Sequence, residues 1–160
     1  DPSMLPQWFF IFLRYFDNRD LSFFYNTNPK ISKSKLLVLK NDTYDEFGAR
    51  YGISSEGSDM AFYLGQLVPN DALINLTDGQ VYATPYQLIG FGVNKAFNDY
   101  LLKFDVAYKN NIQQNRTGQF IKVDRLDWDL AFDIQNDDRQ WLIYINSQYI
   151  LYLADDYLTS

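Results

Sequence analysis

Aspartates are the residues of this chain with the most evident chemical potential. Asp127, Asp129 and Asp133 would share one face of a continuous strand. Paired carboxylates can hydrolyse a glycosidic bond, and several together can hold a hard metal ion, although the spacing of a calcium-binding EF-hand loop is absent. We therefore interpret them first as the solvated face of a strand, second as an acidic recognition patch, and last as a catalytic or metal site. The whole acidic run is Asp124, Asp127, Asp129, Asp133, Asp137 and Asp138.

The chain contains no histidine and no cysteine. This excludes the usual general base at neutral pH, the commonest zinc ligands, thiol nucleophiles and disulfides. The glycines of Gly90-Phe91-Gly92 lack the spacing of a nucleotide-binding loop, and no serine has a histidine partner. We expect a protein that is not an enzyme and that has neither a cofactor nor a metal.

Composition favours a binding protein. The net charge is −6, which argues against nucleic acid as a partner, because neutralising phosphates needs clustered Lys and Arg. Aromatic residues make up 18% of the chain; they fill a β-rich core or, in the alternative, form a partly exposed contact patch.

The apolar run Trp8–Leu13 is too short to span a bilayer and is followed by Arg14, so we expect no membrane span. It also lacks the features of a signal peptide. The absence of cysteine is consistent with a cytoplasmic protein. Three Asn-x-Thr glycosylation sequons, at Asn41, Asn75 and Asn115, keep a secreted or virion-associated origin as the alternative.

Three segments are predicted to be helical. Pro6–Phe16 is apolar on most sides, so a buried strand is its alternative. Tyr44–Tyr51 is bounded by a capping residue and a glycine. Residues 94–104 place Phe97 and Leu101 at helical spacing, as structural residues of the core, although residues 102–108 also alternate as a strand would.

The remaining apolar runs predict strands. One hairpin is expected where Asp78-Gly79 separates two short apolar runs, with Gly79 at positive φ. A second is expected around Asn146-Ser147-Gln148, and residues 109–118 are a polar linker to this β-rich tail. The predicted strands are Leu21–Tyr25, Leu36–Leu39, Ala61–Leu67, Leu73–Leu76, Val81–Ala83, Phe120–Val123, Trp128–Ile134, Trp141–Ile145 and Tyr149–Leu153.

These elements predict a single α+β domain over residues 1–160, with a mixed or antiparallel sheet, a few helices and a β-rich C-terminal part. We interpret Asp1–Ser3, before Met4, as a cloning remnant. An all-β sandwich is the alternative.

One stretch resembles a known family. Phe62–Gly65, Ala72–Leu76, Asp78–Tyr82 and Gly92–Leu101 follow the order of motifs in the SUKH superfamily: a strand ending at glycine, a strand leading through an acidic-Gly turn into Val-Tyr, and a helix with Phe-x-x-Tyr-Leu. The resemblance covers residues 61–104. It implies an α+β fold and a bacterial immunity protein that neutralises a toxin by direct binding.

The function predicted from the sequence is recognition of a macromolecular partner, possibly a basic toxin, through an acidic and aromatic surface. The alternatives are a lectin-like or viral β-sandwich that binds glycans, and a structural assembly subunit. The candidate contact residues are Asp127, Trp128, Asp129, Asp133, Asp137, Asp138 and Trp141.

Overall fold

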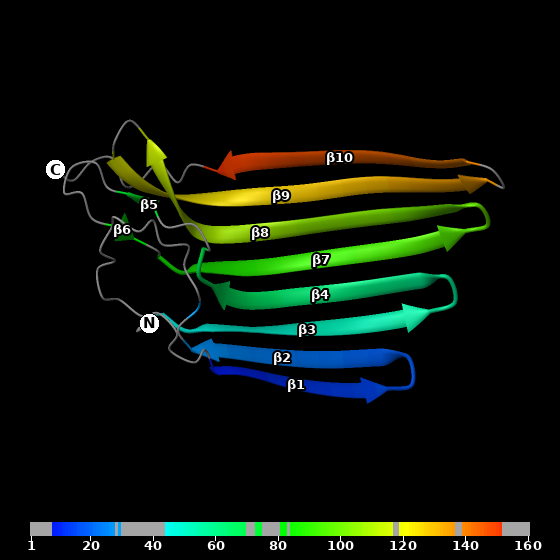
Figure 1. Ribbon diagram of the computed structural model, residues 1–160, viewed down its shortest axis with the longest axis horizontal. Coiled ribbons are helices and arrows are strands. Elements are labelled where there is room, and N and C mark those ends of the chain that lie inside the picture. The colour runs from blue at the N-terminus through cyan, green and yellow to red at the C-terminus, as the bar shows by residue number, and fades with distance from the viewer. Residues whose placement is uncertain are drawn as a thin grey trace, which may run out of the picture.

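The computed structural model describes residues 8–27, 29, 44–69, 73–74, 81–82, 84–116, 119–136 and 139–151. All regular structure in these ranges is β-strand, arranged as one eight-stranded sheet and one two-stranded sheet (Figure 1). The strands are β1 (Trp8–Phe16), β2 (Arg19–Thr27), β3 (Glu46–Ser55), β4 (Ser58–Leu67), β5 (Leu73–Ile74), β6 (Val81–Tyr82), β7 (Tyr86–Phe97), β8 (Tyr100–Arg116), β9 (Gln119–Asn136) and β10 (Arg139–Leu151).

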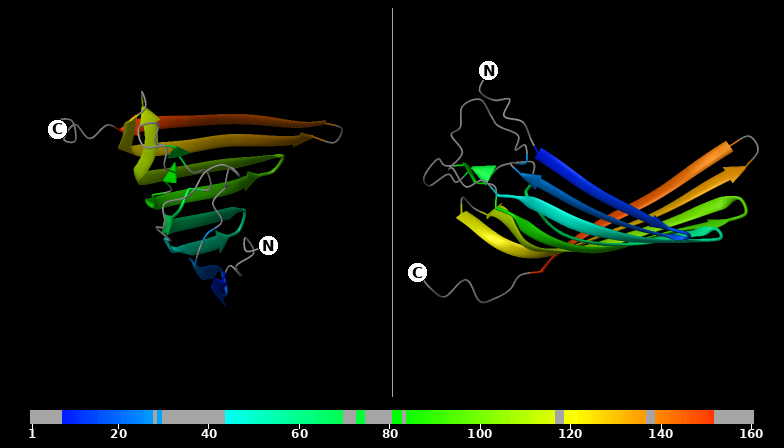
Figure 2. Two further views of the ribbon diagram at one scale, coloured as in Figure 1. Left: turned by 60° about the vertical axis from the view of Figure 1, so that its left-hand side comes forward. Right: turned by 90° about the horizontal axis from the view of Figure 1, so that it is seen from below.

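The large sheet is an antiparallel meander in which each strand pairs with the next one along the chain, in the order β1-β2-β3-β4-β7-β8-β9-β10. The small β5–β6 sheet lies in the connection between β4 and β7, at one end of the large sheet (Figure 1). Figure 2 shows that the large sheet is a single bent and twisted layer. The outer edges of β1 and β10 pair with no strand among the described residues.

The predicted α+β fold is wrong, because all three predicted helices are strands. The described part of Pro6–Phe16 is β1, and Tyr44–Tyr51 falls largely in β3. Residues 94–104 form the end of β7, a two-residue turn at Asn98-Asp99, and the start of β8. Phe97 and Tyr100 stack across this turn with ring centroids 4.8 Å apart, so their helix-like spacing comes from a hairpin. The all-β alternative fits, with one large sheet in place of a sandwich.

Several predicted strands are confirmed: Leu21–Tyr25 lies in β2, Ala61–Leu67 in β4 and Trp128–Ile134 in β9. The predicted pairing around Asp78-Gly79 is also present, since β5 pairs with β6, but Gly79 lies outside the described residues, as does Leu36–Leu39. The predicted linker over 109–118 is wrong, because β8 continues to Arg116. The predicted loop at residues 146–148 is likewise part of β10.

Strand alternation divides the large sheet into two chemically different faces. Directly paired residues share a face, and successive residues of one strand point to opposite faces. The row Arg50–Tyr63–Gly90–Ala107–Asp127 belongs to one face, which we call the polar face. The next row, Tyr51–Phe62–Phe91–Val106–Trp128, belongs to the other face, which we call the apolar face.

The hairpins of the sheet are staggered. Arg14, Tyr51, Phe91 and Trp128 lie in one register row across the sheet. Beyond this row, β1 continues for two residues to Phe16, β3 for four to Ser55, β7 for six to Phe97 and β9 for eight to Asn136. Figure 1 shows this as hairpin ends that reach progressively further from β1 to β10. A stagger of one residue per strand corresponds to a strand tilt of roughly 35°, the tilt of sheets that close on themselves.

Glycines on the polar face let the strands and side chains approach closely. A Cβ atom on Gly65 would lie 2.8 Å from the Phe47 carbonyl oxygen and 3.2 Å from the Cα of Gly48, its cross-strand partner. A Cβ on Gly52 would collide with the Asp20 carboxylate, and one on Gly92 with that of Asp105. Glycine is therefore needed at these positions for neighbouring polar side chains to lie flat over the sheet.

Candidate functional site

The apolar face is unusually exposed for a folded protein. Phe62 is 48% exposed, Leu64 59% and Ile89 65%, although all three lie on interior strands of the sheet. Among the described residues the buried apolar side chains are small: Ala61, Val68, Val123 and Ala131. The exposed large apolar side chains of this face are Phe10, Phe12, Phe16, Phe23, Tyr25, Phe47, Phe62, Leu64, Ile89, Tyr100, Ile134, Trp141, Ile143, Ile145, Tyr149 and Leu151.

The energetic cost of leaving this face in water is large. A fully buried large apolar side chain contributes about 1.5–3 kcal/mol, so covering sixteen that are about half exposed is worth on the order of 20 kcal/mol. The net stability of a whole domain is about 5–15 kcal/mol. Covering this face with an apolar environment would therefore contribute at least as much free energy as the net stability of a domain.

Charged residues lie at the margins of the apolar face, and the buried Asp124, paired with Leu151, is at the end opposite the hairpins. Within residues 10–27, 46–67, 86–108, 126–134 and 141–151, the charged positions on this face are Arg14, Arg19 and Lys95. Arg19 begins β2, and Arg14 and Lys95 lie two residues before the ends of β1 and β7. All three are thus at the hairpin end of their strands. Arg14 and Lys95 also lie over the rings of Phe16 and Phe97, at 5.0 and 5.2 Å from the ring centroids.

The two ends of the sheet have different connections. At the hairpin end, the described connections Asp17-Asn18, Glu56-Gly57 and Asn98-Asp99 are two-residue turns. At the opposite end, residues 28–45 and 68–85 join their strands, and β8 and β9 extend well beyond their neighbours (Figure 1). Tyr25, Tyr108 and Tyr149 lie on the apolar face toward this second end.

The polar face contains a hollow of about 700 Å³. Charged side chains from β3, β8 and β9 line it, namely Arg50, Asp105, Lys109, Arg125, Asp127 and Asp129. Tyr63, Asn146 and Gln148 also contribute, and Gly65 and Gly90 form part of its floor. Apolar side chains, among them Phe24, Leu67 and Leu88, also line the hollow, so it combines charged, polar and apolar groups from strands distant in sequence.

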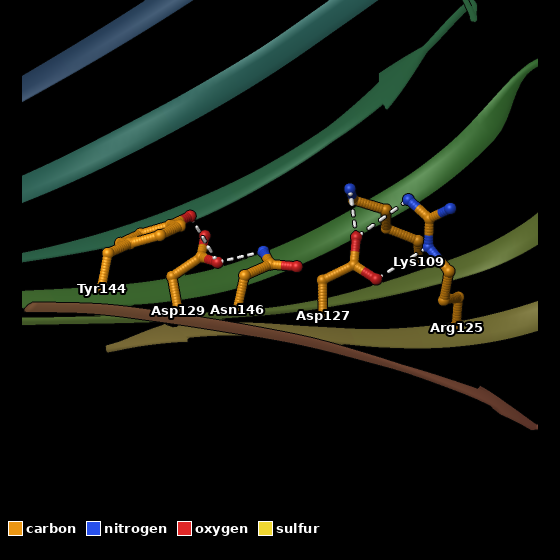
Figure 3. Close-up of polar contacts among 6 residues, drawn as sticks. All are labelled: Lys109, Arg125, Asp127, Asp129, Tyr144 and Asn146. Carbon is orange, nitrogen blue, oxygen red and sulfur yellow. Dashed lines mark hydrogen bonds and ion pairs between the residues drawn. The ribbon is translucent and has the colours of Figure 1, made fainter. Parts of the chain in front are cut away.

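Ion pairs hold the cations of this hollow, and two of these cations share one carboxylate. Asp127 accepts a hydrogen bond of 2.6 Å from Lys109 Nζ and one of 2.9 Å from an Arg125 guanidinium nitrogen (Figure 3). Arg125 Nε also lies 2.7 Å from Asp127 Oδ1, as an ion pair without hydrogen-bond geometry. On β2 and β3, Arg50 pairs with Asp20. Each of these three cations thus has a carboxylate partner.

Asp105 and Asp129 are directly opposite each other on β8 and β9. Asp129 accepts hydrogen bonds from the Tyr144 hydroxyl at 2.9 Å and from the Asn146 amide (Figure 3). These donors are neutral and leave its charge uncompensated. Burial raises the pKa of Asp105, and the neighbouring charge of Asp129 raises it further, while Lys103 opposes the change. The two carboxylates form the negative centre of the hollow.

Asp124 has a local structural role. Its buried carboxylate accepts hydrogen bonds from the Tyr108 hydroxyl and from the Asn111 backbone N–H, the latter at 3.2 Å. This interaction lies at the register shift between Lys109 and Ile112, where Asn111 has a φ of 62°. Asp124 thus stabilises the bulge where β8 and β9 leave the body of the sheet.

The structure separates the predicted contact residues. Asp127, Asp129 and Asp133 are on the polar face, as their alternation predicts, whereas Trp128 and Trp141 are on the apolar face. Asp137 and Asp138 lie outside the described residues. The predicted structural residues Phe97 and Leu101 are both half-buried, on opposite faces. Among the described residues of the acidic run, only the buried Asp124 shares a face with the tryptophans.

Sequence reasoning missed Lys109, Arg125, Arg50 and Asp105 as site residues. The signal was present in the sequence, because charged residues and glycines alternate with large apolar residues in β3, β7, β8 and β9. It becomes conspicuous only when all these segments are recognised as strands.

Comparison of the chain with protein-family models, curated proteins and solved structures gives no match. The SUKH resemblance and the immunity function it implies therefore stay predictions. In the part of the chain that the structure describes, no helix has the length and apolarity needed to cross a bilayer. Across the same residues, no three acidic side chains are grouped so that they could hold a metal ion.

Proposed function

We propose that this protein is embedded in a membrane through its β-strands, with the apolar face against lipid acyl chains and the polar face turned toward water. The observation that carries this proposal is the separation of the two faces across the six interior strands, β2, β3, β4, β7, β8 and β9. It departs from the sequence-based expectation of no membrane span.

The dimensions of the sheet support this arrangement. A nine-residue strand tilted by roughly 35° rises about 25 Å along the membrane normal, the height of the apolar band of membrane-spanning strands. The nine residues of β1 and β2 meet this requirement, and the other strands of the large sheet are longer. Short turns at one end and long connections at the other are also typical of such sheets.

The placement of charge supports it as well. A cation in the middle of a bilayer costs about 2–4 kcal/mol, and the cost falls to about 0–1 kcal/mol near the interface. Arg14, Arg19 and Lys95 all lie at the hairpin margin of the apolar face, where headgroups and water would solvate them. The band between this margin and the tyrosines at the far end carries no charge within the ranges given above.

The free edges of β1 and β10 add a requirement. Unpaired backbone N–H and C=O groups are costly in hydrocarbon, so sheet edges in a bilayer must be paired. These edge strands also expose apolar side chains on the polar-face side, including Ile11, Leu13, Leu142 and Ile150. We therefore propose that the eight strands form an arc of a closed transmembrane sheet, in which neighbouring strands cover both edges.

A single-cysteine scan along β4 tests this proposal, and the absence of native cysteine makes the labelling unambiguous. Spin labels are placed one at a time at residues 61 to 66 of the full chain, reconstituted in phosphatidylcholine vesicles. We expect labels at Phe62 and Leu64 to collide with oxygen dissolved in lipid, and a label at Tyr63 to collide with a water-soluble nickel chelate.

A label at Glu56, in an exposed turn, serves as the control that should always contact the chelate. Chelate contact at Phe62 and Leu64 equal to that at Glu56 would exclude a lipid-facing surface, and so would a failure of the chain to associate with vesicles.

A further inference from the structure

We propose that the polar face lines an aqueous passage that favours cations over anions, with Asp105 and Asp129 as the residues that set this preference. This inference rests on the membrane-embedded sheet proposed above, and adds to it the chemical class of the solute, small hydrated cations.

The first support is the balance of charge on the polar face. Its acidic residues among those described are Asp20, Glu46, Asp59, Asp105, Asp127, Asp129 and Asp133. Its basic residues are Arg50, Lys103, Lys109 and Arg125. Carboxylates thus outnumber cations on the surface that would face the passage, and charged rings of one sign select ions of the other sign in channels.

The second support is the pattern of pairing. Arg50 is held by Asp20, and Lys109 and Arg125 share Asp127, so all three cations of the hollow are in ion pairs. Asp129, by contrast, is held by the neutral donors of Tyr144 and Asn146. Asp105 and Asp129 are therefore the carboxylates lining the hollow that have no ion pair among the described residues.

The third support is steric. Gly92 is the cross-strand partner of Asp105 on β7, and Gly90 is the next residue of β7 on the same face. Because neither glycine has a side chain, β7 places nothing between the Asp105 carboxylate and the hollow. Tyr63, on β4, reaches toward the same place, with its hydroxyl 3.5 Å from the position of a Gly92 Cβ. The row from Ala61 through Gly92 to Asp105 and Asp129 thus leaves both carboxylates open to an ion in the hollow.

The expected strength follows from Coulomb's law. In water, an unpaired carboxylate about 7 Å from the ion path raises the local concentration of a monovalent cation about two- to threefold and lowers that of an anion by the same factor. Salt weakens this effect, since the screening length is about 10 Å at 0.1 M.

The test is the reversal potential of the full chain in planar phosphatidylcholine bilayers under a potassium chloride gradient. We expect the wild type to prefer potassium over chloride, and the Asp105→Asn/Asp129→Asn double variant to lose at least about half of that preference at low salt. The matched control is Asp17→Asn/Asp99→Asn, which removes the same charge from two exposed turns and should leave the preference unchanged.

The outcomes separate the two proposals. Chain that shows neither vesicle association nor conductance contradicts the membrane-embedded sheet itself. A membrane-inserted chain that does not conduct, that prefers chloride, or whose preference is equal in the double variant and the wild type overturns the cation passage alone.

Discussion

A single arginine on the apolar face provides the sharpest physical test of the sheet's environment. Leu64 is 59% exposed, and it lies six residues beyond Ser58, the first residue of β4 at the hairpin end. At a strand tilt of roughly 35°, six residues correspond to about 16 Å along the membrane normal, close to the middle of a band whose margin is set by Arg14 and Lys95. Leu64→Arg should therefore lower the free energy of unfolding in vesicles by about 2–4 kcal/mol.

The same substitution near the far interface is the matched control. Gln66 is on the same face of the same strand, two residues closer to the long connections, and Gln66→Arg should cost only about 0–1 kcal/mol. The assay is denaturant unfolding of each variant in phosphatidylcholine vesicles, followed by tryptophan fluorescence. In water, arginine in place of an exposed leucine changes stability by about 0.5 kcal/mol at most. If Leu64→Arg and Gln66→Arg both lower the free energy of unfolding by only about that amount, Leu64 does not face lipid.

Two further changes probe the polar face. Gly65→Val should lower the free energy of unfolding by about 1–3 kcal/mol, because its Cβ would meet the Phe47 carbonyl oxygen at 2.8 Å; unchanged stability in denaturant would show that the strands can separate there. Asp105→Asn should stabilise the protein at neutral pH, because the raised pKa means that ionisation of this carboxyl is less favourable in the folded state than in the unfolded one. This gain should disappear as the pH falls below the ordinary value of 3.8, where both states are protonated, and a gain that is independent of pH would contradict the electrostatic cause.

The sequence predicted strands well where apolar and polar residues alternate. Trp128–Ile134 alternates with Asp127, Asp129 and Asp133, and the structure keeps this alternation as two faces. The prediction failed where two strands meet at a short turn, as at Phe97 and Tyr100, because a hairpin can place aromatic residues at helical spacing. It also failed for Trp8–Leu13, because β1 is a sheet edge with apolar residues on both faces, which removes the alternation that identifies a strand.

The site was harder to predict than the strands, because it depends on register. Lys109, Arg125 and Asp127 come together only through the pairing of β8 with β9, and Arg50 meets Asp20 through the pairing of β2 with β3. A shift of one residue in either pairing would move these side chains to the opposite face. The sequence-based prediction named aromatic residues and carboxylates as the contact residues and placed them on one surface. Strand alternation instead places Trp128 and Asp127 on opposite sides of β9.

The composition of the polar face determines how much stabilisation the apolar face must contribute, because both faces belong to the same strands. The polar face needs glycine at Gly65 and Gly92 so that carboxylates and strands can pack closely, and glycine contributes no side chain to a core. In a two-layered domain, a second layer packed on the polar face would stabilise the sheet. Here that stabilisation must come from the apolar face instead. Sixteen exposed large apolar side chains provide it only if that side is removed from water. A sheet with a hydrated, charged hollow on one face would thus be stable with its other face covered by hydrocarbon, so the proposed lipid-facing surface and the proposed polar passage depend on each other.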